Sequence, residues 1–387
     1  MGVYIREIQA AETALWDAYV HAHPKATLYH LYGWRNVIKK TYGHNTYYLA
    51  AIQDVSSRSS AIQSPSQRDL HIPSTNIEHP ASDVRIVGLL PLVHLKHFLF
   101  GNRLISMPFF DLGGILADNP ETERALLQHA INLGRRLRAS AIELRHAEPL
   151  SCLNSTISAT RVNNVPVLTR SHKVRMLLDL PDSQEELMKL FKAKLRSQIR
   201  KPMKEGLKTR IGGDELLEDF YRVFSINMRD LGSPVHSKRL MRFVLEEFPG
   251  NARLAVVYGG SRPMAVSLVA QFGEIMENPW ASSLRAYSHL SPNMLLYWSM
   301  LEYACKQGLS RFDFGRSSPG EGTYKFKEQW GARPNPLHWH HVSLLGPHVE
   351  NGPNEKTRFE ALIRWWRKLP VPMTRLIGPM IRKHIGL

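Results

Sequence analysis

The residues best suited to chemistry lie together in residues 311–331, RFDFGRSSPGEGTYKFKEQWG. An acid, Asp313, lies in a short apolar strand that leads into a loop rich in glycine and proline. Such a loop exposes backbone N–H groups at the carboxyl end of a strand, where α/β folds bind ligands. The residues after the loop could bind a phosphate or stack on a base: Lys325, Lys327, Tyr324, Phe326 and Trp330. A structural turn followed by an amphipathic segment is the simpler explanation of this stretch taken alone.

The sequence lacks the common motifs of several other enzyme classes. It contains no Gx4GK[ST], GxSxG or HExxH segment, which excludes P-loop proteins, hydrolases with a nucleophile elbow, and zincins. The LHWHH segment carries His338, His340 and His341 without clustered acids or cysteines. We therefore expect an alternating strand with exposed histidines there, and no metal site.

The composition is that of a folded protein with an anionic partner. At 387 residues the chain is long for a single core, so we expect two domains. Its 43% of hydrophobic residues and 22% of charged residues are typical of a globular protein. The net charge of +16 favours an anionic membrane, a nucleic acid or a phosphorylated substrate as partner.

Cysteine usage and the N-terminus indicate the compartment. The two cysteines, Cys152 and Cys305, form no CxxC pair, which excludes a disulfide framework or zinc knuckle and favours a reducing compartment. Arg6 and three acids interrupt the N-terminal segment, so it lacks the apolar core of a signal peptide. The most apolar run, residues 84–100, is broken by a proline, a histidine and a lysine and is too short to span a bilayer. We expect a cytoplasmic protein and leave peripheral attachment to the inner face of the membrane open.

Helices and strands alternate in two halves, which must position the 311–331 stretch. In the first half, apolar spacing predicts helices at 13–22, 31–40 and 120–138 and strands at 46–52, 84–95 and 141–144. Residues 54–83 are rich in serine and proline, which predicts a long, disordered, solvent-exposed insert between two strands. In the second half we predict strands at 173–180, 252–258, 264–272 and 281–287, with helices beginning at Ser183, Asp214, Ser237 and Ser291.

A weak internal repeat links the two halves. The segment SAIELRHAEP (140–149) follows a predicted helix, and SRFDFGRSSP (310–319) follows another. The alignment places Glu143 opposite Asp313, and strands followed by a helix precede both copies. We predict a repeated α/β unit in which one half is catalytic and the other supports it, because only the second copy carries the glycine loop and the lysines.

Two stretches are strongly basic. Residues 187–210 hold nine Lys/Arg against one acid and carry an apolar helical stripe, which favours an anion-facing ridge over a merely solvated helix face. Residues 356–383 hold eight Lys/Arg and one acid, mixed with two tryptophans and several aliphatic residues. This composition suits a helix in the interface of an anionic membrane. A helix packed back on the protein, or bound to a partner, fits equally well.

Seven segments together carry a family resemblance: WRNVIKKTYGH (34–44), PFFDLGG (108–114), LRSQIRKPMKEG (195–206), FYRVFSINMRDLGSPV (220–235), ENPWASSLRAY (277–287), SPNMLLYW (291–298) and FDFGRSSPGEGTYKFKEQWGA (312–332). On these segments the chain resembles the FemAB family of peptidoglycan-bridge aminoacyltransferases, and most of all the FemAB-related proteins of bacterial exosortase/PEP-CTERM systems. The resemblance implies an α/β fold of two tandem GNAT-like domains, each a mixed central sheet flanked by helices. Residues 1–165 would form the first domain, residues 166–345 a second domain with the catalytic loop, and residues 346–387 a basic tail.

The resemblance also implies a reaction and a donor site. The reaction is transfer of an aminoacyl or other acyl group to an amine of a phosphate-bearing cell-envelope precursor, with aminoacyl-tRNA or acyl-CoA as co-substrate and no permanently bound cofactor. The FKxxFG motif of the family appears here with Trp330 in place of its second phenylalanine. The lysine of that motif holds the tRNA end of the donor, a role that would fall to Lys327. We assign donor binding to Gly315, Arg316, Tyr324, Phe326 and Lys327.

The acceptor site is implied by two further motifs. An IRKA-like motif appears as IRKP at 199–202, and its arginine contacts the acceptor's phosphates in the family, which makes Arg196 or Arg200 the candidate. A lysine in the tryptophan-containing N-terminal helix has a similar role, for which Lys39 is the candidate. The full predicted acceptor set is Trp34, Lys39, Arg196, Arg200, Trp280 and Arg285. The chain lacks the coiled-coil arm of some members, and its serine- and proline-rich insert matches no feature of the family.

Attack of an amine on an activated ester or thioester needs positioning, an oxyanion stabiliser and a proton acceptor, but no covalent nucleophile. Asp313, or a phosphate of the substrate, could accept the proton, and backbone N–H groups near Gly315 could stabilise the oxyanion. We therefore predict Asp313 and Lys327 as catalytic residues, while a structural role for Asp313 at a strand end fits equally well.

Two other hypotheses stay open. The first is an N-acyltransferase that depends on acyl-CoA. The second is a catalytically idle module that binds RNA or a membrane through residues 187–210 and the tail, with steep salt dependence.

Overall fold

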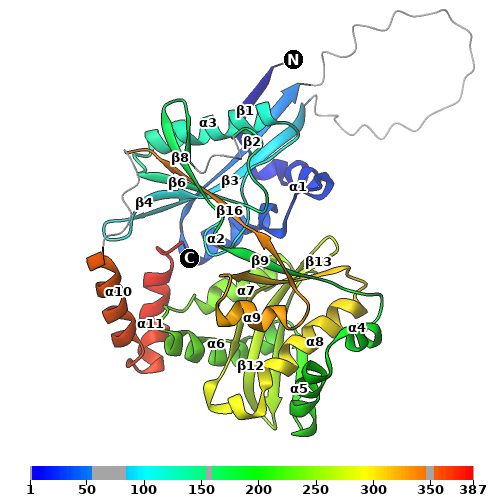
Figure 1. The fold of residues 1–387 in the computed structure, drawn as a ribbon. Helices are drawn as coiled ribbons and strands as arrows, with labels where there is room; N and C mark the ends of the chain where they lie inside the picture. The colour runs from blue at the N-terminus through cyan, green and yellow to red at the C-terminus, as the bar shows by residue number, and fades with distance from the viewer. Residues whose placement is uncertain (1, 55–83, 154–158, 346–352, 387) are drawn as a thin grey trace, which may run out of the picture.

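The computed structural model describes residues 2–54, 84–153, 159–345 and 353–386, so all but the first residue of the predicted 54–83 insert lies outside the described residues. Two mixed β-sheets form the two halves of the molecule, and helices pack between and around them (Figure 1). This arrangement confirms the predicted α/β fold of two units, each a mixed sheet flanked by helices.

The first sheet has nine strands among the described residues, in the order β1-β2-β3-β4-β6-β16-β8-β7, with β5 paired to β3. Its strands are β1 (Val3–Glu7), β2 (Asn45–Asp54), β3 (Val84–His97), β4 (Gly101–Ile105), β5 (Leu116–Ala117), β6 (Ala141–His146), β7 (Ala159–Val162), β8 (Val165–Arg170) and β16 (His338–Ser343). Strand β16 pairs with both β6 and β8, so a late segment of the chain returns to the first sheet.

The second sheet has seven strands among the described residues, in the order β10-β11-β12-β13-β14-β9-β15. They are β9 (Val174–Asp179), β10 (Lys208–Gly212), β11 (Ala252–Gly259), β12 (Arg262–Phe272), β13 (Ile275–Ser283), β14 (Arg311–Ser317) and β15 (Arg333–Pro336). Strands β8 and β16 fall in the predicted second domain by residue number but pair in the first sheet. The domain boundaries at residues 165 and 345 stay predictions.

Helices cover both sheets and join them. They are α1 (Thr13–Ala22), α2 (Gly33–Tyr42), α3 (Pro120–Arg136), α4 (Gln184–Leu190), α5 (Ala193–Lys204), α6 (Leu217–Leu231), α7 (Lys238–Glu247), α8 (Pro292–Lys306), α9 (Gly322–Glu328), α10 (Pro353–Trp366) and α11 (Val371–Arg382). Helix α3 packs on one face of the first sheet, and α5 and α8 pack on one face of the second. A shared core fills the space between the halves, where the rings of Trp34 on α2 and Phe248 after α7 lie 5.0 Å apart.

Local sequence explains where several helices begin and end. The side chains of Asn119, Ser183 and Ser237 accept hydrogen bonds from backbone N–H groups at the starts of α3, α4 and α7. Gly43 and Gly232 end α2 and α6 in the left-handed conformation that favours glycine. Asn119, Ser183 and Ser237 are at or next to predicted helix starts, so the local sequence was enough to predict where these helices begin.

The predicted repeat is confirmed by strand pairing. In the first sheet β4 and β6 run parallel, with Ile105 paired to Glu143. In the second sheet β13 and β14 run parallel, with Glu277 paired to Asp313. The aligned acids Glu143 and Asp313 thus occupy the same register position in the two halves.

Three local expectations were wrong. Residues 187–210 do not form one helix, because Phe191 adopts an extended backbone and buries its ring 5.6 Å from that of Trp330, which separates α4 from α5. The strand expected at 281–287 lies earlier, at β13. The expected strand at His338–Ser343 exists, but His340 is buried there, because β16 lies between β6 and β8.

No helix within the described residues combines the length and the apolar character that a bilayer span requires.

Candidate functional site

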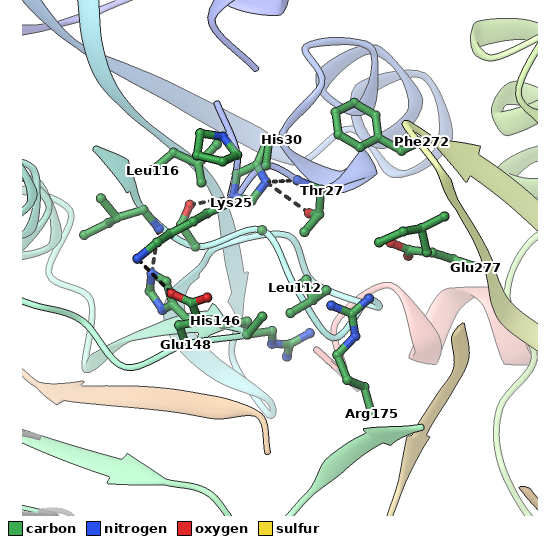
Figure 2. Close-up of a pocket in the computed structure, with 18 of the residues that line it drawn as sticks. Lys25, Thr27, His30, Leu112, Leu116, His146, Glu148, Arg175, Phe272 and Glu277 are labelled. Atoms are coloured by element: carbon green, nitrogen blue, oxygen red, sulfur yellow. Dashed lines mark hydrogen bonds and ion pairs between the residues drawn. The ribbon is translucent and has the colours of Figure 1, made fainter. Parts of the chain in front are cut away.

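The candidate site is a cavity of about 240 Å³ between the two halves (Figure 2). His30 and His146 line it from the first half, while Arg175 and Glu277 line it from the second sheet. A smaller hollow of about 30 Å³ adjoins this cavity, because Leu112, Arg175 and Glu277 line both. A substrate in the cleft would therefore contact both halves of the chain.

Glu277 lies where the parallel strands β13 and β14 part. The two strands pair at three positions, and the last of these joins Glu277 to Asp313. The ladder between β12 and β13 is irregular at the same place, between Leu268 and Ala270. Pro279 follows and has no N–H with which to continue a ladder. The parting strands leave the Glu277 side chain at the cavity wall.

The surroundings of Glu277 raise the pKa of its carboxyl into the neutral pH range. Burial, together with the carboxylates of Asp313 and Asp111, raises the pKa of Glu277 to about 7, against the lowering effect of the Arg175 guanidinium. The buried Tyr29 hydroxyl also interacts with this carboxyl. A carboxyl that gains and loses its proton near neutral pH is suited to general acid–base chemistry.

Asp313 is bound on both of its oxygens. Its Oδ2 accepts a hydrogen bond from Arg175 Nε at 2.8 Å, and its Oδ1 accepts one from the Gly315 N–H at 2.8 Å. Arg175 Nη2 lies 2.7 Å from the same Oδ2, although it makes no hydrogen bond of good geometry with any described residue. The Asp313–Arg175 pair is buried, so each charge depends on the other.

Lys327 is buried on α9 and holds the backbone of the predicted glycine loop, whose first residues, Gly315 and Arg316, lie in β14. Its ammonium donates to the carbonyl oxygens of Gly315 at 3.0 Å and Arg316 at 2.8 Å. Burial lowers the pKa of Lys327 to about 8, while Asp313 and Asp111 raise it. Gly315 has a φ of 76°, a conformation that favours glycine at this turn. The lysine therefore sets the backbone position of the loop next to Asp313.

A strained segment of the first half forms the facing wall. Met107 and Phe109 have φ values of 59° and 77°, which are uncommon for residues with side chains. The buried Arg145 guanidinium holds the segment by donating to the carbonyl oxygens of Met107 and Phe110. A Cβ at Gly114 would overlap the ring of His146, so glycine is required there.

Two buried histidines line the larger cavity in their neutral form. Burial lowers the pKa of His30 to about 4 and lowers that of His146 well below its usual value. His146 Nε2 accepts a hydrogen bond from the Ile115 N–H at 2.7 Å. At the mouth Lys25 and Glu148 form an ion pair at 2.7 Å. Among the described residues, no group of three or more His, Cys, Asp and Glu side chains is placed to hold a metal ion.

The structure brings four of the predicted site residues together. Asp313, Gly315 and Arg316 lie on β14, and Lys327 on α9 donates to the carbonyl oxygens of Gly315 and Arg316. The Arg316 guanidinium lies 3.5 Å from Asp111 in the facing wall and 5.1 Å from the centre of the Trp339 ring. Two more, Tyr324 and Phe326, are partly buried against the core of the second sheet.

The predicted acceptor residues do not converge on this cleft. Trp34 is fully buried and donates from Nε1 to Leu28 O. Arg196 donates to Phe191 O at the start of α5. Lys39, Arg200 and Arg285 are exposed on separate elements. Trp280 lies closest to the cleft, partly buried with its ring 5.2 Å from that of Phe110, which lines the smaller hollow.

The sequence analysis missed Glu277, Arg175 and Tyr29 as site residues. Glu277 was quoted only within the ENPWASSLRAY segment. Its signal was a single acid directly after an apolar dipeptide, which becomes informative only once residues 275–283 are known to form a strand. The sequence around Arg175 and Tyr29 does not indicate a site, because only the fold brings these residues close to Asp313 and Glu277.

Comparisons with known proteins agree with this architecture. The family model of the acetyltransferase (GNAT) domain matches residues 190–328, which contain Glu277, Asp313 and Lys327. The solved structure of FemX is similar with a TM-score of 0.60 and 14% identity, covering 88% of this chain and 98% of that chain. A conserved protein of unknown function from Bacteroides thetaiotaomicron VPI-5482 has a TM-score of 0.52 and 9% identity, covering 88% of this chain and 100% of that chain.

A tandem GNAT protein from the clavulanic acid biosynthesis pathway has a TM-score of 0.47 and 12% identity, covering 90% of this chain and 100% of that chain. No curated protein matches the sequence. Residues 190–328 therefore match the acetyltransferase (GNAT) domain model, and the fold resembles that of FemX over most of this chain.

Proposed function

We propose that this protein transfers an acyl or aminoacyl group to an amine in the cleft between its two halves, with Glu277 as proton acceptor. The observation that carries the proposal is the Glu277 carboxyl, which is buried at the parting of β13 and β14, lines both cavities and has its pKa raised to about 7. The GNAT domain match over residues 190–328 supports acyl transfer as the reaction class.

The reaction balances with the groups at hand. The amine nitrogen attacks the carbonyl carbon of the donor ester or thioester and forms the C–N bond, and Glu277 takes the proton that the nitrogen releases. The bond from the carbonyl carbon to oxygen or sulfur then breaks, and the leaving group takes up the proton from Glu277, which returns this residue to its carboxylate form. Arg175 lines both cavities and would stabilise the oxyanion.

Asp313 and Lys327 take supporting roles in this proposal. Asp313 holds the Arg175 guanidinium, and Lys327 holds the carbonyl groups of Gly315 and Arg316. The Gly315 N–H, a predicted oxyanion donor, already donates to Asp313. The predicted donor residues Arg316 on β14 and Tyr324 and Phe326 on α9 lie on adjoining elements, which supports a donor path along α9.

The acceptor we propose is an amine-bearing, phosphate-containing precursor of the bacterial cell envelope. The net charge of +16 and the resemblance of the seven segments to FemAB proteins support this choice, including the link to exosortase/PEP-CTERM systems and a cytoplasmic location. Lys25 and Arg311 at the larger cavity and the predicted set Lys39, Arg196 and Arg200 are the cations available for the phosphates. Trp280 beside the smaller hollow and Arg285 complete the proposed acceptor set, whereas the predicted Trp34 is fully buried in the core and does not join it.

Two donors compete. The FemAB resemblance favours aminoacyl-tRNA, whereas the GNAT domain match favours acyl-CoA. An assay with labelled aminoacyl-tRNA and labelled acyl-CoA, each with a panel of amine acceptors, decides between them. Label in an amide product from one donor selects that donor. Binding of RNA with steep salt dependence and no product from either donor would instead support a non-catalytic module and overturn the proposal.

A further inference from the structure

Exposed apolar side chains gather on one flank of the molecule. Of the thirteen exposed large apolar residues among the described residues, seven lie on α10, on α11 or in the turn between β3 and β4. On α11 they are Met373, Leu376 and Met380, which are 45%, 73% and 64% exposed. Their spacing of three and four residues places them in one stripe along the helix.

The opposite face of α11 is fixed to the protein, so the stripe has a defined direction. Thr374, Gly378 and Arg382 are buried. Arg375 Nε donates to Ser225 Oγ on α6 at 2.8 Å, and Arg382 Nε donates to His236 Nε2 at 3.0 Å. Because these contacts set the rotation of the helix, the stripe points away from the core.

Two neighbouring segments extend the stripe into a surface. The turn between β3 and β4 presents Phe98 and Leu99, which are 88% and 71% exposed. This turn lies beside the end of α11, because the rings of His97 and His384 are 4.2 Å apart. Helix α10 runs beside α11 in Figure 1 and exposes Trp365. An apolar surface therefore continues across segments that are far apart in the sequence.

Positive charge accompanies this surface. Residues 360–386 contain six Lys/Arg and one acid, Glu360. Arg364, Arg367 and Lys368 are exposed on and after α10, and Lys96 is exposed beside the β3–β4 turn. Apolar side chains that project from a rigid helix among basic residues match the interface of a bilayer that contains anionic lipid. A protein groove would match the apolar stripe alone and leaves the excess charge unexplained.

We propose that this docking surface, formed by Phe98, Leu99, Trp365, Met373, Leu376 and Met380 with the surrounding basic residues, binds the protein to an anionic membrane surface. The inference goes beyond the proposed acyl transfer, because it concerns no residue of the cleft. It also joins two of the three alternatives that the sequence left open for the tail, because α11 packs back on the protein and offers its outer face to lipid.

Removing the tail would be a poor test, because the end of the tail also supports the cleft. The Phe109 N–H in the strained wall donates to Gly386 O at 2.6 Å, and His44 Nε2 lies 2.8 Å from Lys383 O. Substitutions of exposed residues leave these contacts in place and are the sharper experiment.

The test is co-sedimentation with vesicles of phosphatidylcholine alone or of phosphatidylcholine with phosphatidylglycerol. The variants are Leu376→Glu/Met380→Glu and Phe98→Glu/Leu99→Glu, with Arg364→Glu/Lys368→Glu to test the charge. Leu190→Glu is the matched control, because Leu190 is 73% exposed, as Leu376 is, and its helix α4 lies on the other side of the molecule from α11 in Figure 1.

We expect wild type and Leu190→Glu to bind the anionic vesicles, and each double variant to bind at least about tenfold less, because a carboxylate in the interface opposes both insertion and lipid charge. Binding of wild type should weaken between about 50 and 500 mM salt and be slight on phosphatidylcholine alone. The double variants should keep the wild-type circular dichroism spectrum, which shows that they are folded. They should also keep the wild-type turnover on a soluble acceptor, which shows that weaker membrane binding is independent of the proposed acyl transfer. Equal binding by wild type and the double variants, no binding by wild type, or retention of RNA rather than vesicles by this surface would overturn the proposal.

Discussion

Glu277 and Asp313 are partners at the last paired position of the parallel strands β13 and β14, yet their carboxyls are held in opposite ways. Asp313 is bound by Arg175 and by the Gly315 N–H, whereas Glu277 lines both cavities and has its pKa raised to about 7. The equivalent position in the first half pairs Ile105 with Glu143. The first half thus keeps an acid equivalent to Asp313 but has an isoleucine where Glu277 lies, which agrees with the proposal that the second half is catalytic and the first supports it.

Replacing Asp313 by Asn should destabilise the fold. The change leaves the buried Arg175 guanidinium without its counter-charge, which costs about 3–5 kcal/mol of the free energy of unfolding. Chemical denaturation of wild type and variant measures the loss. The matched control is Asp179→Asn, which breaks an exposed pair with Arg311 on the same two strands and should cost less than about 1 kcal/mol. Equal losses for both variants would contradict the assignment of Asp313.

Replacing Glu277 by Gln should stabilise the fold at alkaline pH. The pKa of Glu277 is raised in the folded state, so the folded protein binds a proton more tightly than the unfolded chain, and stability falls as the pH rises from about 4.5 to about 7. Gln avoids the burial of a charge and should raise the free energy of unfolding at about pH 8 by up to about 3 kcal/mol. The difference should vanish below about pH 4.5. Denaturation curves at several pH values check this, and a variant that is less stable at every pH would refute it.

Replacing Lys327 by Ala should lower turnover. The change releases the carbonyl groups of Gly315 and Arg316, which lets the loop beside Asp313 move, and a misplaced loop should reduce kcat/KM at least about tenfold. Lys325→Ala, on the exposed side of the same helix, is the control and should retain activity. If Lys327→Ala keeps both turnover and donor affinity, the role given to this loop is wrong.

Replacing Gly114 by Ala should disturb the cavity wall. The added Cβ would overlap the His146 ring, which accepts the hydrogen bond from the Ile115 N–H, at a cost of about 1–3 kcal/mol. Gly250→Ala, where a Cβ meets no atom within 4 Å, is the control. The midpoint of thermal unfolding is measured for both variants. An unchanged midpoint for Gly114→Ala would contradict the claim that the cavity wall has no room for a Cβ at this position.

Much of the fold could be predicted because its signals are local. Capping residues such as Ser183 and Ser237 satisfy N–H groups of their own helices, so they mark helix starts from sequence alone. The repeat was visible because β6 and β14 meet similar parallel partners, which places Glu143 and Asp313 at one register position. These features depend on neighbours within a few residues or on a repeated pattern.

The remaining features depend on contacts that are distant in sequence. Glu277 becomes a candidate base only through burial and through charges contributed by Arg175 and Asp313, which are remote along the chain. His340 is buried because β16 pairs with β6 and β8 in the first sheet, and no local sequence pattern predicts that pairing. The break at Phe191 follows from its packing on Trp330, which overrides helical propensity. Tertiary packing decided each of these cases.

The measurement that tests the central claim most directly is the pH dependence of kcat/KM for wild type and Glu277→Gln, with whichever donor yields an amide product. If Glu277 accepts the proton, wild-type kcat/KM should rise between about pH 6 and 8 with an apparent pKa near 7, and Glu277→Gln should lose about 10²- to 10⁴-fold in rate together with this rise. A Glu277→Gln enzyme that is correctly folded and keeps both the wild-type rate and the wild-type pH profile would contradict the account.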